Sequence, residues 1–336
     1  MRHQPLLKYR LLCGVLDECD ITLPAAGGMT VTSTTSEFVW PRPALADCIT
    51  AMVIRDTRGC GLDQNQRFNY FPASPTPALI FMFAGDSHTV DDPDLMSRPW
   101  MAARRRSNFT FIGPQPSPII SWNPGEVYWV FIGFYPYALF AMTGLDLSSF
   151  VGFELPAEEA LPQPILGVCR NFFDAVPRHG LERSFSTLED ELEIIWADAR
   201  PAGTKSQRLI ADWSRSVVAA AAATGSGRST RQVQRRVKSW TGVAERDLLG
   251  FSQVQQLHLK VYEAERKGDV DWARLAAASG FADQPHMIKR VKQHTGFTPK
   301  QLYEYARCDE AFWFHRVYAR MIEQYLGGSG TRTDGV

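Results

Sequence analysis

Two stretches of the sequence repeat one arrangement of basic, amide and apolar residues. This repeat is the most specific functional signal in the sequence. Residues 229–242 and 283–296 align at an offset of 54 residues (283 − 229). Each stretch starts with a good helix-capping residue, Ser229 or Asp283, and ends at a glycine suited to a left-handed C-terminal position. Both stretches therefore predict helices of about three turns.

A helical wheel separates the apolar from the polar positions in each copy. We expect Val233, Val237 and Trp240 to be buried in the first helix, and Met287 and Val291 in the second. The outward positions are Arg231, Gln234, Arg235 and Lys238 in the first copy, with Arg236 on a flank, and Gln284, Pro285, Ile288, Lys289 and Lys292 in the second, with Arg290 at the place that matches Arg236.

An exposed helix face of this composition has the chemistry to enter the major groove of DNA. Arginine pairs with guanine O6 and N7, glutamine with adenine N6 and N7, and flanking lysines and arginines contact phosphates. A solvated basic face is the commoner fate of a single basic helix. Two copies with the same cap, core and basic registers favour DNA binding over that alternative.

The elements around the second copy predict a helix-turn-helix. Residues 270–283 read as a short helix followed by a tight turn at Gly280, and the capped helix comes next. Between the copies, residues 245–266 have helical spacing and predict one long connecting helix. At 1.5 Å per residue this helix is roughly 30–33 Å long, which is close to one turn of B-DNA, about 34 Å.

Residues 275–287 (LAAASGFADQPHM) and 289–299 (KRVKQHTGFTP) resemble the second unit of AraC/XylS-family transcription regulators, and the resemblance extends over about residues 215–305. It implies double-stranded promoter DNA as a partner and recruitment or exclusion of RNA polymerase. It also implies base-reading positions at Arg231, Gln234 and Arg235, and at Gln284, Pro285, Ile288 and Lys289. Pro285 and Ile288 depart from the amide or guanidinium contacts often found there, which favours contact with thymine methyls or the DNA backbone. The first unit has a longer turn, at residues 224–228, than the family usually shows.

The remaining chain predicts an α+β multidomain protein. Apolar runs bounded by turn residues, such as 78–84, 108–113 and 126–134, are strand signals in a β-rich domain over residues 1–155. Residues 156–204 predict a helical connector, residues 205–325 an all-α domain with two helix-turn-helix units and its own core, and residues 326–336 a disordered tail. Short motifs at 43–47, 71–83, 111–115 and 133–140 resemble the cupin-like β-barrel sensor domain of a subgroup of these regulators. That resemblance implies a small-molecule effector or a homodimer contact.

Composition places the chain among ordinary globular proteins. It has 336 residues, of which 45% are hydrophobic and 21% charged, and a formal net charge of zero. The charge is segregated, because residues 1–224 carry 18 Lys and Arg against 24 Asp and Glu, whereas residues 225–325 carry 17 against 11. A basic C-terminal part suits an anionic partner. No transmembrane run or secretory signal is evident and the six cysteines are irregularly spaced, so we expect a cytoplasmic protein with reduced thiols.

Catalytic and metal-binding signatures are not found. The seven histidines include no His-x-His pair, no Cys-x-x-Cys occurs, and nucleophile and phosphate-loop motifs are missing. We therefore expect no catalytic residue, cofactor or metal; the alternative is a cupin-type enzyme with an accessory nucleic-acid-binding domain. The run Arg104 to Arg106 reads as an exposed loop, with capture of an acidic effector or contact to DNA as alternatives. Two or three aromatic residues between Trp122 and Phe140 are expected to line an effector cavity, but no effector-binding residue can be assigned.

Overall fold

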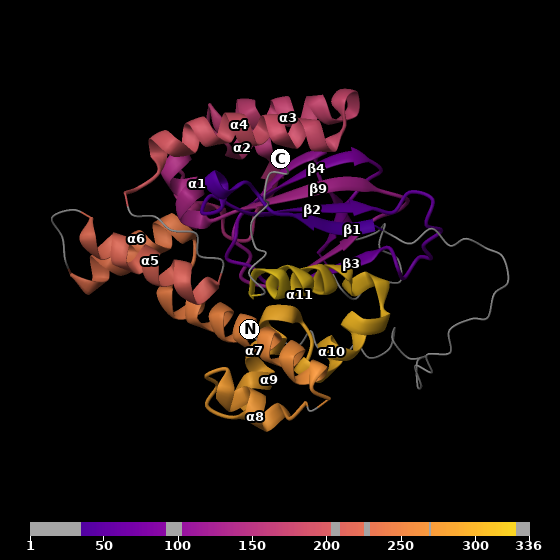
Figure 1. Cartoon of the computed structure of the whole chain (residues 1–336), viewed down its shortest axis with the longest axis vertical. Helices are drawn as coiled ribbons and strands as arrows, with labels where there is room; N and C mark the ends of the chain where they lie inside the picture. Colours follow the sequence, from indigo (N-terminus) through magenta and orange to yellow (C-terminus); the bar gives the residue numbers. More distant parts are fainter. Residues whose placement is uncertain (1–34, 92–102, 203–208, 225–228, 269, 327–336) are drawn as a thin grey trace.

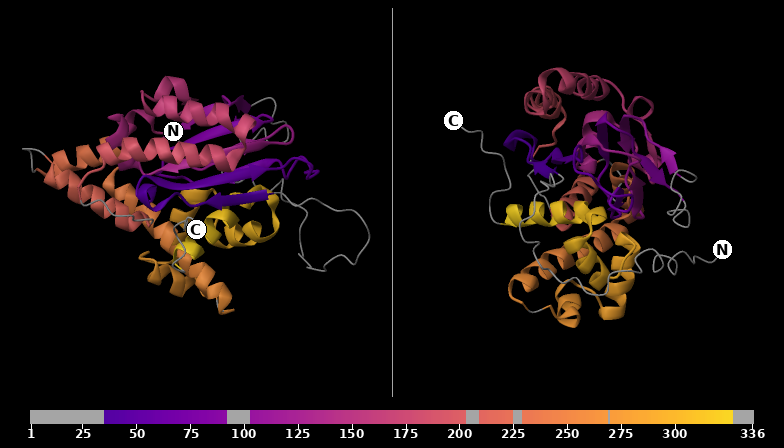
Figure 2. Two further views of the ribbon diagram at one scale, coloured as in Figure 1. Left: turned by 45° about the horizontal axis from the view of Figure 1, so that its top comes forward. Right: turned by 90° about the vertical axis from the view of Figure 1, so that its right-hand side faces the viewer.

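The computed structural model describes residues 35–91, 103–202, 209–224, 229–268 and 270–326. Ten strands and a set of helices form three layers (Figures 1 and 2). Two long helices cover one side of the β region, and the C-terminal helices lie against the other. Of the predicted tail at residues 326–336 and the longer turn at residues 224–228, residues 327–336 and 225–228 lie outside the described residues, as do Cys13 and Cys19. Leu326, the first residue of the predicted tail, is helical.

The strands form two antiparallel sheets, and these two sheets do not close into one barrel as the sequence resemblance implied. The order of the larger sheet is β1-β2-β9-β4-β7-β10, and that of the smaller one is β3-β8-β5-β6. The strands are β1 Thr35–Val39, β2 Ile49–Asp56, β3 Phe68–Phe71, β4 Ala78–Ala84, β5 His88–Val90, β6 Ala103–Arg105, β7 Phe109–Ile112, β8 Ile119–Trp122, β9 Tyr128–Phe134 and β10 Glu154–Pro156.

The central strands β4 and β9 are apolar on both faces, because each face is covered by other elements. The α+β class is confirmed, with a β-rich part followed by helices. The helices are α1 Pro136–Thr143, α2 Ala157–Ala160, α3 Ile165–His179, α4 Leu181–Ala199, α5 Ile210–Ala223, α6 Thr230–Thr241, α7 Glu245–Arg266, α8 Trp272–Ala278, α9 Gln284–Thr295, α10 Pro299–Cys308 and α11 Trp313–Leu326; short 3-10 turns lie at Pro43–Leu45 (η1), Leu147–Phe150 (η4) and Glu310–Phe312 (η5).

The hairpin of α3 and α4 covers the outer face of the larger sheet (Figure 2). Each helix is amphipathic, and its apolar stripe faces the strands. Phe172 of α3 packs edge-on against Phe81 of β4, with ring centroids 4.9 Å apart. Gly180 joins the two helices at a positive φ of 79°, a backbone conformation that favours glycine. Within the described residues, none of the helices has the length and apolar character needed to cross a bilayer.

The inner side of the β region is occupied by α11. Trp313 is 1% exposed, and its indole Nε1 donates a hydrogen bond of 2.7 Å to Asn69 Oδ1 in β3. Its ring also packs edge-on against Trp129 of β9, at 5.6 Å between centroids. Arg55 of β2, also 1% exposed, forms a 2.7 Å ion pair with Glu310 just before α11. These contacts tie the C-terminal helix to both sheets.

The buried clusters of the helical region also contain strand residues. One buried cluster joins strand residues to Trp213 of α5, Trp240 of α6 and Phe251 of α7. A second cluster joins strands β3, β5 and β8 to helices α7 to α10, with Tyr70 of β3 stacked on Phe312 at 4.6 Å. The core expected after residue 205 is therefore shared in part with the strands, because large apolar side chains of that region also pack against them.

We expect a fragment that starts at Lys205 to unfold without a sharp transition and to bind a dye that reports exposed apolar surface. Removal of the β region uncovers the faces of Trp240 and Trp313 that pack on Tyr137 and Trp129. The measurement is thermal unfolding followed by circular dichroism, beside the full chain. In the full chain, Trp313→Ala should lower the free energy of unfolding by about 3–5 kcal/mol. A fragment that unfolds as sharply as the full chain would contradict this prediction.

Candidate nucleic-acid interface

The first repeat forms α6, with the predicted caps. The Ser229 side chain accepts a hydrogen bond from the backbone N–H of Gln232, and Gly242 adopts a positive φ of 74°. Val237 is fully buried, and Trp240 packs on Tyr137 of α1 with ring centroids 5.0 Å apart. The apolar side of α6 is therefore anchored partly on the β region, and its other side faces outward.

The outward side of α6 is open to solvent at four of the five predicted positions. Arg231, Gln234, Arg235 and Lys238 are exposed. Arg236 is half-buried, and its Nη1 donates a hydrogen bond of 2.9 Å to the backbone oxygen of Ala221 in α5. The flank position thus also holds the two helices of the first unit together.

The second repeat forms α9 with the same construction. Asp283 accepts a 2.7 Å hydrogen bond from the backbone N–H of His286, and Gly296 has a positive φ of 84°. Met287 and Val291 are buried, as predicted. Of the predicted outward residues, Gln284, Pro285 and Lys289 are exposed, whereas Ile288, Arg290 and Lys292 are half-buried.

Ile288 is less exposed to solvent than its position on the helical wheel suggested. Its side chain packs against the cluster that includes Met287 and Phe281. Arg290 and Lys292 line a cleft between the helical region and the β region. The outward face of α9 is therefore narrower than the face predicted from the sequence.

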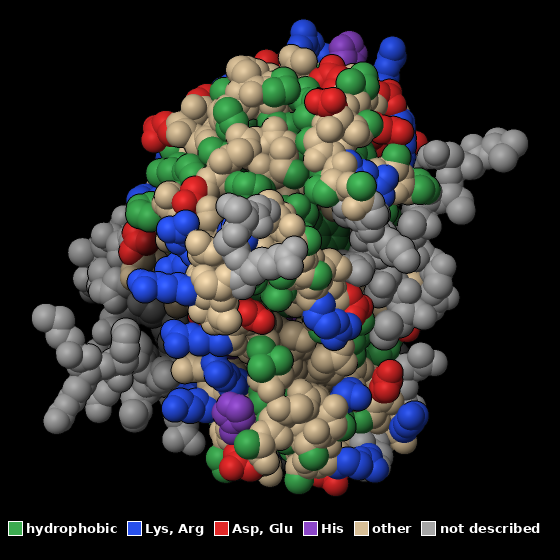
Figure 3. All heavy atoms as spheres, turned by 90° about the vertical axis from the view of Figure 1, so that its left-hand side faces the viewer, with side chains coloured by type: hydrophobic (Ala, Val, Ile, Leu, Met, Phe, Trp, Pro, Cys, Tyr) green, Lys and Arg blue, Asp and Glu red, His purple; other side chains and the backbone are tan. Residues whose placement is uncertain are grey.

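Helix α7 joins the two units over the bounds expected from the sequence. It contains 22 residues, Glu245–Arg266, which correspond to about 33 Å at 1.5 Å per residue. Leu248 and Phe251 in its first half and Leu257 in its second half are buried in different clusters. Helix α7 therefore connects the two units as one continuous helix, and α9 packs back against its first half, where Gly250 lies beside the side chains of Arg290 and His294. Figure 3 shows Lys and Arg side chains gathered in a run down one edge of the molecule, through its middle and lower part.

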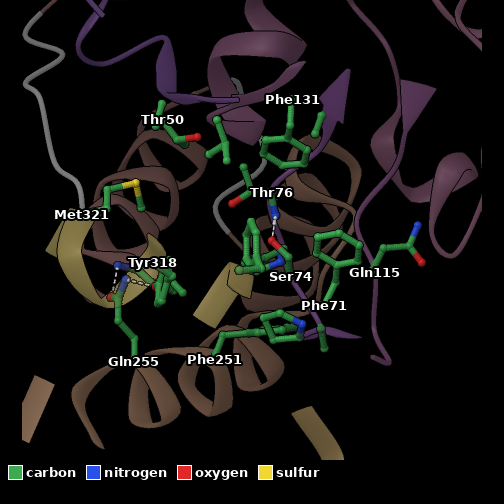
Figure 4. A pocket seen from close by; sticks show the side chains of 18 of the residues that line it. Thr50, Phe71, Ser74, Thr76, Gln115, Phe131, Phe251, Gln255, Tyr318 and Met321 are labelled. Carbon is green, nitrogen blue, oxygen red and sulfur yellow. Dashed lines mark hydrogen bonds between the residues drawn. The ribbon is translucent and has the colours of Figure 1, made fainter. Parts of the chain in front are cut away.

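An apolar cavity of about 190 Å³ lies where the larger sheet meets α5, α7 and α11 (Figure 4). Phe131 and Tyr135 line it, which places two members of the aromatic run at a cavity. Its polar groups are largely engaged, since Gln255 Nε2 donates to the Tyr318 hydroxyl at 2.8 Å. The α11 residues Phe314, Tyr318, Met321 and Ile322 complete the wall. Sequence reasoning missed these four residues, because no local pattern shows where α11 docks.

The run Arg104 to Arg106 belongs to β6 and its end, and it is not the exposed loop expected from the sequence. Arg106 is buried, and its Nη2 donates a 2.6 Å hydrogen bond to Glu154 Oε1. Burial disfavours the charged form of Glu154, but Arg106 outweighs it and holds the pKa of that carboxyl below its ordinary value. Arg105 pairs with Asp86 at 2.6 Å on the surface. The three arginines thus have three different environments.

Two histidines, the half-buried His258 and the buried His315, lie between α7 and α11. The rings of His258 and His315 are 6.4 Å apart, and His315 Nε2 has no hydrogen-bond partner within the described part of the chain. Burial lowers the pKa of His258 to about 4 and that of His315 to about 3. Both rings are therefore neutral near pH 7. Within the described ranges, no three His, Cys, Asp or Glu side chains are grouped so that they could hold a metal ion.

Comparisons with known proteins give matches among solved structures. No protein-family model matches the chain, and no curated protein matches its sequence. The chain is similar to ToxT from Vibrio cholerae in its P21 crystal form, with 10% identity over 70% of this chain and 92% of that one and a TM-score of 0.33. ToxT bound to (E)-4-(8-methylnaphthalen-1-yl)but-3-enoic acid is 10% identical over 70% of this chain and 92% of that one, with a TM-score of 0.31. ToxT bound to an unsaturated fatty acid is 9% identical over 71% of this chain and 94% of that one, with a TM-score of 0.31. Similarity at this level assigns neither a family nor a function, which have to be argued from the chain's own helices.

We expect the chain to lose stability as the pH falls from about 6.5 towards 4. In the unfolded chain His258 and His315 titrate near the ordinary value of about 6.5, whereas in the folded chain they resist protonation. The unfolded state therefore takes up more protons in this window, and each histidine costs on the order of 1 kcal/mol per pH unit. The measurement is the free energy of unfolding in urea at several pH values. The double variant His258→Phe and His315→Phe should flatten the slope, whereas His179→Gln, at the exposed end of α3, is the matched control. An unchanged slope in the double variant would refute the assignment.

Proposed function

We propose that the chain is a sequence-specific, DNA-binding transcription regulator of the AraC/XylS type. The observation that carries the proposal is the pair of capped helices, α6 and α9, which bury matching apolar faces and leave Arg, Gln and Lys side chains on the opposite faces. Each follows another helix across a short connection, as the second helix of a helix-turn-helix does. Such a helix presents its outer side chains to base edges in the major groove.

The roles of the exposed residues follow from their chemistry. Arg231, Gln234 and Arg235 are proposed to read bases from α6, and Gln284, Pro285 and Lys289 from α9, with Ile288 at the edge of that face. Lys238, Arg290, Lys292 and Arg236 are proposed to contact phosphates. Pro285 has no amide or guanidinium group, so α9 is proposed to discriminate fewer bases than α6.

The length of α7 supports binding of one protomer to two sites. A helix of about 33 Å is close to the 34 Å of one turn of B-DNA. It can therefore hold α6 and α9 in successive major-groove segments on one face of the duplex. A single chain would then recognise two short boxes about ten base pairs apart without a palindrome.

We infer that the apolar cavity at the junction of the two regions is the effector site. Its walls come from the β region and from α5, α7 and α11, so a ligand bound there contacts both. Among the described residues that line it, Arg106 is the one arginine, and it is already bonded to Glu154, which favours an uncharged apolar ligand. Such a ligand shifts the population of DNA-competent chains only through different affinities for the two states. Contact with RNA polymerase and formation of a homodimer are proposed from the family resemblance.

Loss of a base-reading arginine should relax sequence preference. Arg235→Ala should cost about 1–3 kcal/mol of specific binding and broaden the preference at one or two positions, because one bidentate base contact is lost. The measurement is selection from random duplexes followed by titration of the selected site. Arg215→Ala, which removes an exposed arginine of α5 paired with Asp212, is the matched control. It should change neither the affinity for the selected site nor the base preference. If Arg235→Ala leaves the preference untouched, the outward face of α6 is not the reading face.

The rigid spacer predicts a strict distance between the two boxes. Five extra base pairs should place the second box on the opposite face of the duplex and abolish specific binding by one protomer. Ten extra base pairs should not restore it, because α7 is a continuous helix that does not stretch. Mobility-shift titrations of the three duplexes test this. Full recovery with ten extra base pairs would show two flexibly tethered units instead of one rigid reader.

A further inference from the structure

A second hollow, distinct from the apolar cavity, lies between the β region and the C-terminal ends of both repeat helices. This cleft has a volume of about 1070 Å³, slightly larger than the roughly 300–1,000 Å³ typical of small-molecule sites. Its walls come from β5, β6, β8 and residues 115–118 and 151–154 on one side, and from α6, α7 and α9 on the other. A ligand inside it would therefore contact the β region and both units of the helical region.

Five cationic side chains line this cleft, and they come from four different elements. They are Arg104 of β6, Lys238 of α6, Arg246 of α7, and Arg290 and Lys292 of α9. Three acidic side chains, Asp91, Glu154 and Asp247, also line it.

The acidic groups are engaged by arginines and do not neutralise the other cations. Glu154 is bonded to Arg106 at 2.6 Å and to Arg104 at 3.4 Å. Asp91 lies 3.7 Å from Arg104, and Asp247 lies 3.6 Å from Arg246.

Three of the five cations form no ion pair within the described part of the chain. These are Lys238, Arg290 and Lys292, although Lys238 lies near enough to Asp146 for the two charges to attract. Like charges that converge on one hollow repel each other, and an anion between them removes that cost. Phosphate groups suit such a site, since lysine and arginine both donate charge-assisted hydrogen bonds to phosphate oxygens.

We propose that this cleft binds a small anion carrying two or more phosphate groups. Its phosphates contact Lys238, Arg290 and Lys292 from the helical side and Arg104 from the β side. The apolar wall, with Phe71, Ile119 and Phe297 among its members, can cover a planar group attached to the phosphates. The ligand is thus either a nucleotide or an inorganic polyphosphate, and both share the same phosphate chemistry.

Calorimetric titration of the full chain with pyrophosphate and, separately, with ATP tests the proposal at constant ionic strength. We expect saturable binding of one anion per chain. Arg104→Gln should weaken it by about tenfold or more, because a charge-assisted contact is lost. Tighter binding of ATP than of pyrophosphate identifies a nucleotide as the ligand, and equal binding identifies an inorganic polyphosphate.

The chain offers a matched control on the same strand. Arg105 is adjacent to Arg104 but pairs with Asp86 and does not line the cleft. Arg105→Gln removes the same charge and should leave anion binding unchanged. An equal loss in Arg104→Gln and Arg105→Gln, or binding that does not saturate, overturns the proposal because it reports general attraction to a basic surface.

A second variant covers the case in which Arg104→Gln unfolds the chain through the loss of its bond to Glu154. Lys292→Gln breaks no ion pair of the described residues, and circular dichroism checks that it is folded. It should also weaken anion binding by about tenfold. Unchanged binding of the anion in a folded Lys292→Gln variant overturns the proposal.

A competition experiment separates this proposal from the proposed function. Only this experiment rests on the proposed function, because it requires that the chain binds DNA. Lys238, Arg290 and Lys292 would serve both DNA phosphates and the anion, so pyrophosphate should lower the affinity for the selected duplex more than a chloride salt of equal ionic strength does. Arg104→Gln should reduce that extra effect without changing DNA affinity in the absence of pyrophosphate. A chain that binds the anion but no DNA refutes the proposed function alone, and a chain that binds DNA but no anion refutes this inference alone.

Discussion

The position of the helical region depends on the burial of one indole ring. Trp313 lies between the two sheets, where its N–H must find a partner, because an unpaired polar group in such a place is costly. Asn69 provides that partner at 2.7 Å, and its own amide group donates to Asn123 at 2.7 Å. Beside it the buried charge of Arg55 requires Glu310. These requirements are met together in one placement of α11, and the helices that precede α11 are positioned with it.

The elements that the sequence predicted well are those decided by neighbouring residues. The caps Ser229 and Asp283 and the glycines at the other ends of α6 and α9 act within a few residues, so both helices lie where the repeat placed them. The same holds for α7, whose bounds Glu245–Arg266 follow from local periodicity. The β-rich character of the first half was equally visible in its short apolar runs.

What the sequence did not reveal depends on contacts between distant residues. Whether strands close into a barrel is decided by pairings such as β2 with β9 and β3 with β8, and alternation along a strand does not specify its neighbour. Trp313 and Asn69 are 244 residues apart, so the docking of α11 was hidden. Arg236 looks like any flanking arginine until the backbone oxygen of Ala221 is known to lie beside it.

The apolar cavity and the charged cleft are neighbours that share part of one wall. Phe251 of α7 and His294 of α9 line both hollows, and their rings meet edge-on at 4.6 Å. His294 belongs to a helix that carries proposed base-reading residues. A ligand in either hollow would therefore press on the same two rings. Because close-packed interiors are hardly compressible and transmit strain, two ligands would influence each other through this wall.

The shared cores have a consequence for how such a protein can be recombined. A reader of two DNA boxes is an attractive part to exchange between chains, but here its tryptophans are seated in pockets that belong to the other half. In a chimera that joins this helical region to a foreign sensor domain, the aromatic rings would be exposed, because the strand residues that they pack against would be missing. The workable cut is therefore not at residue 205. A chimera would have to keep the contacts of α11, so Asn69, Arg55 and their neighbours would have to be transferred together with that helix.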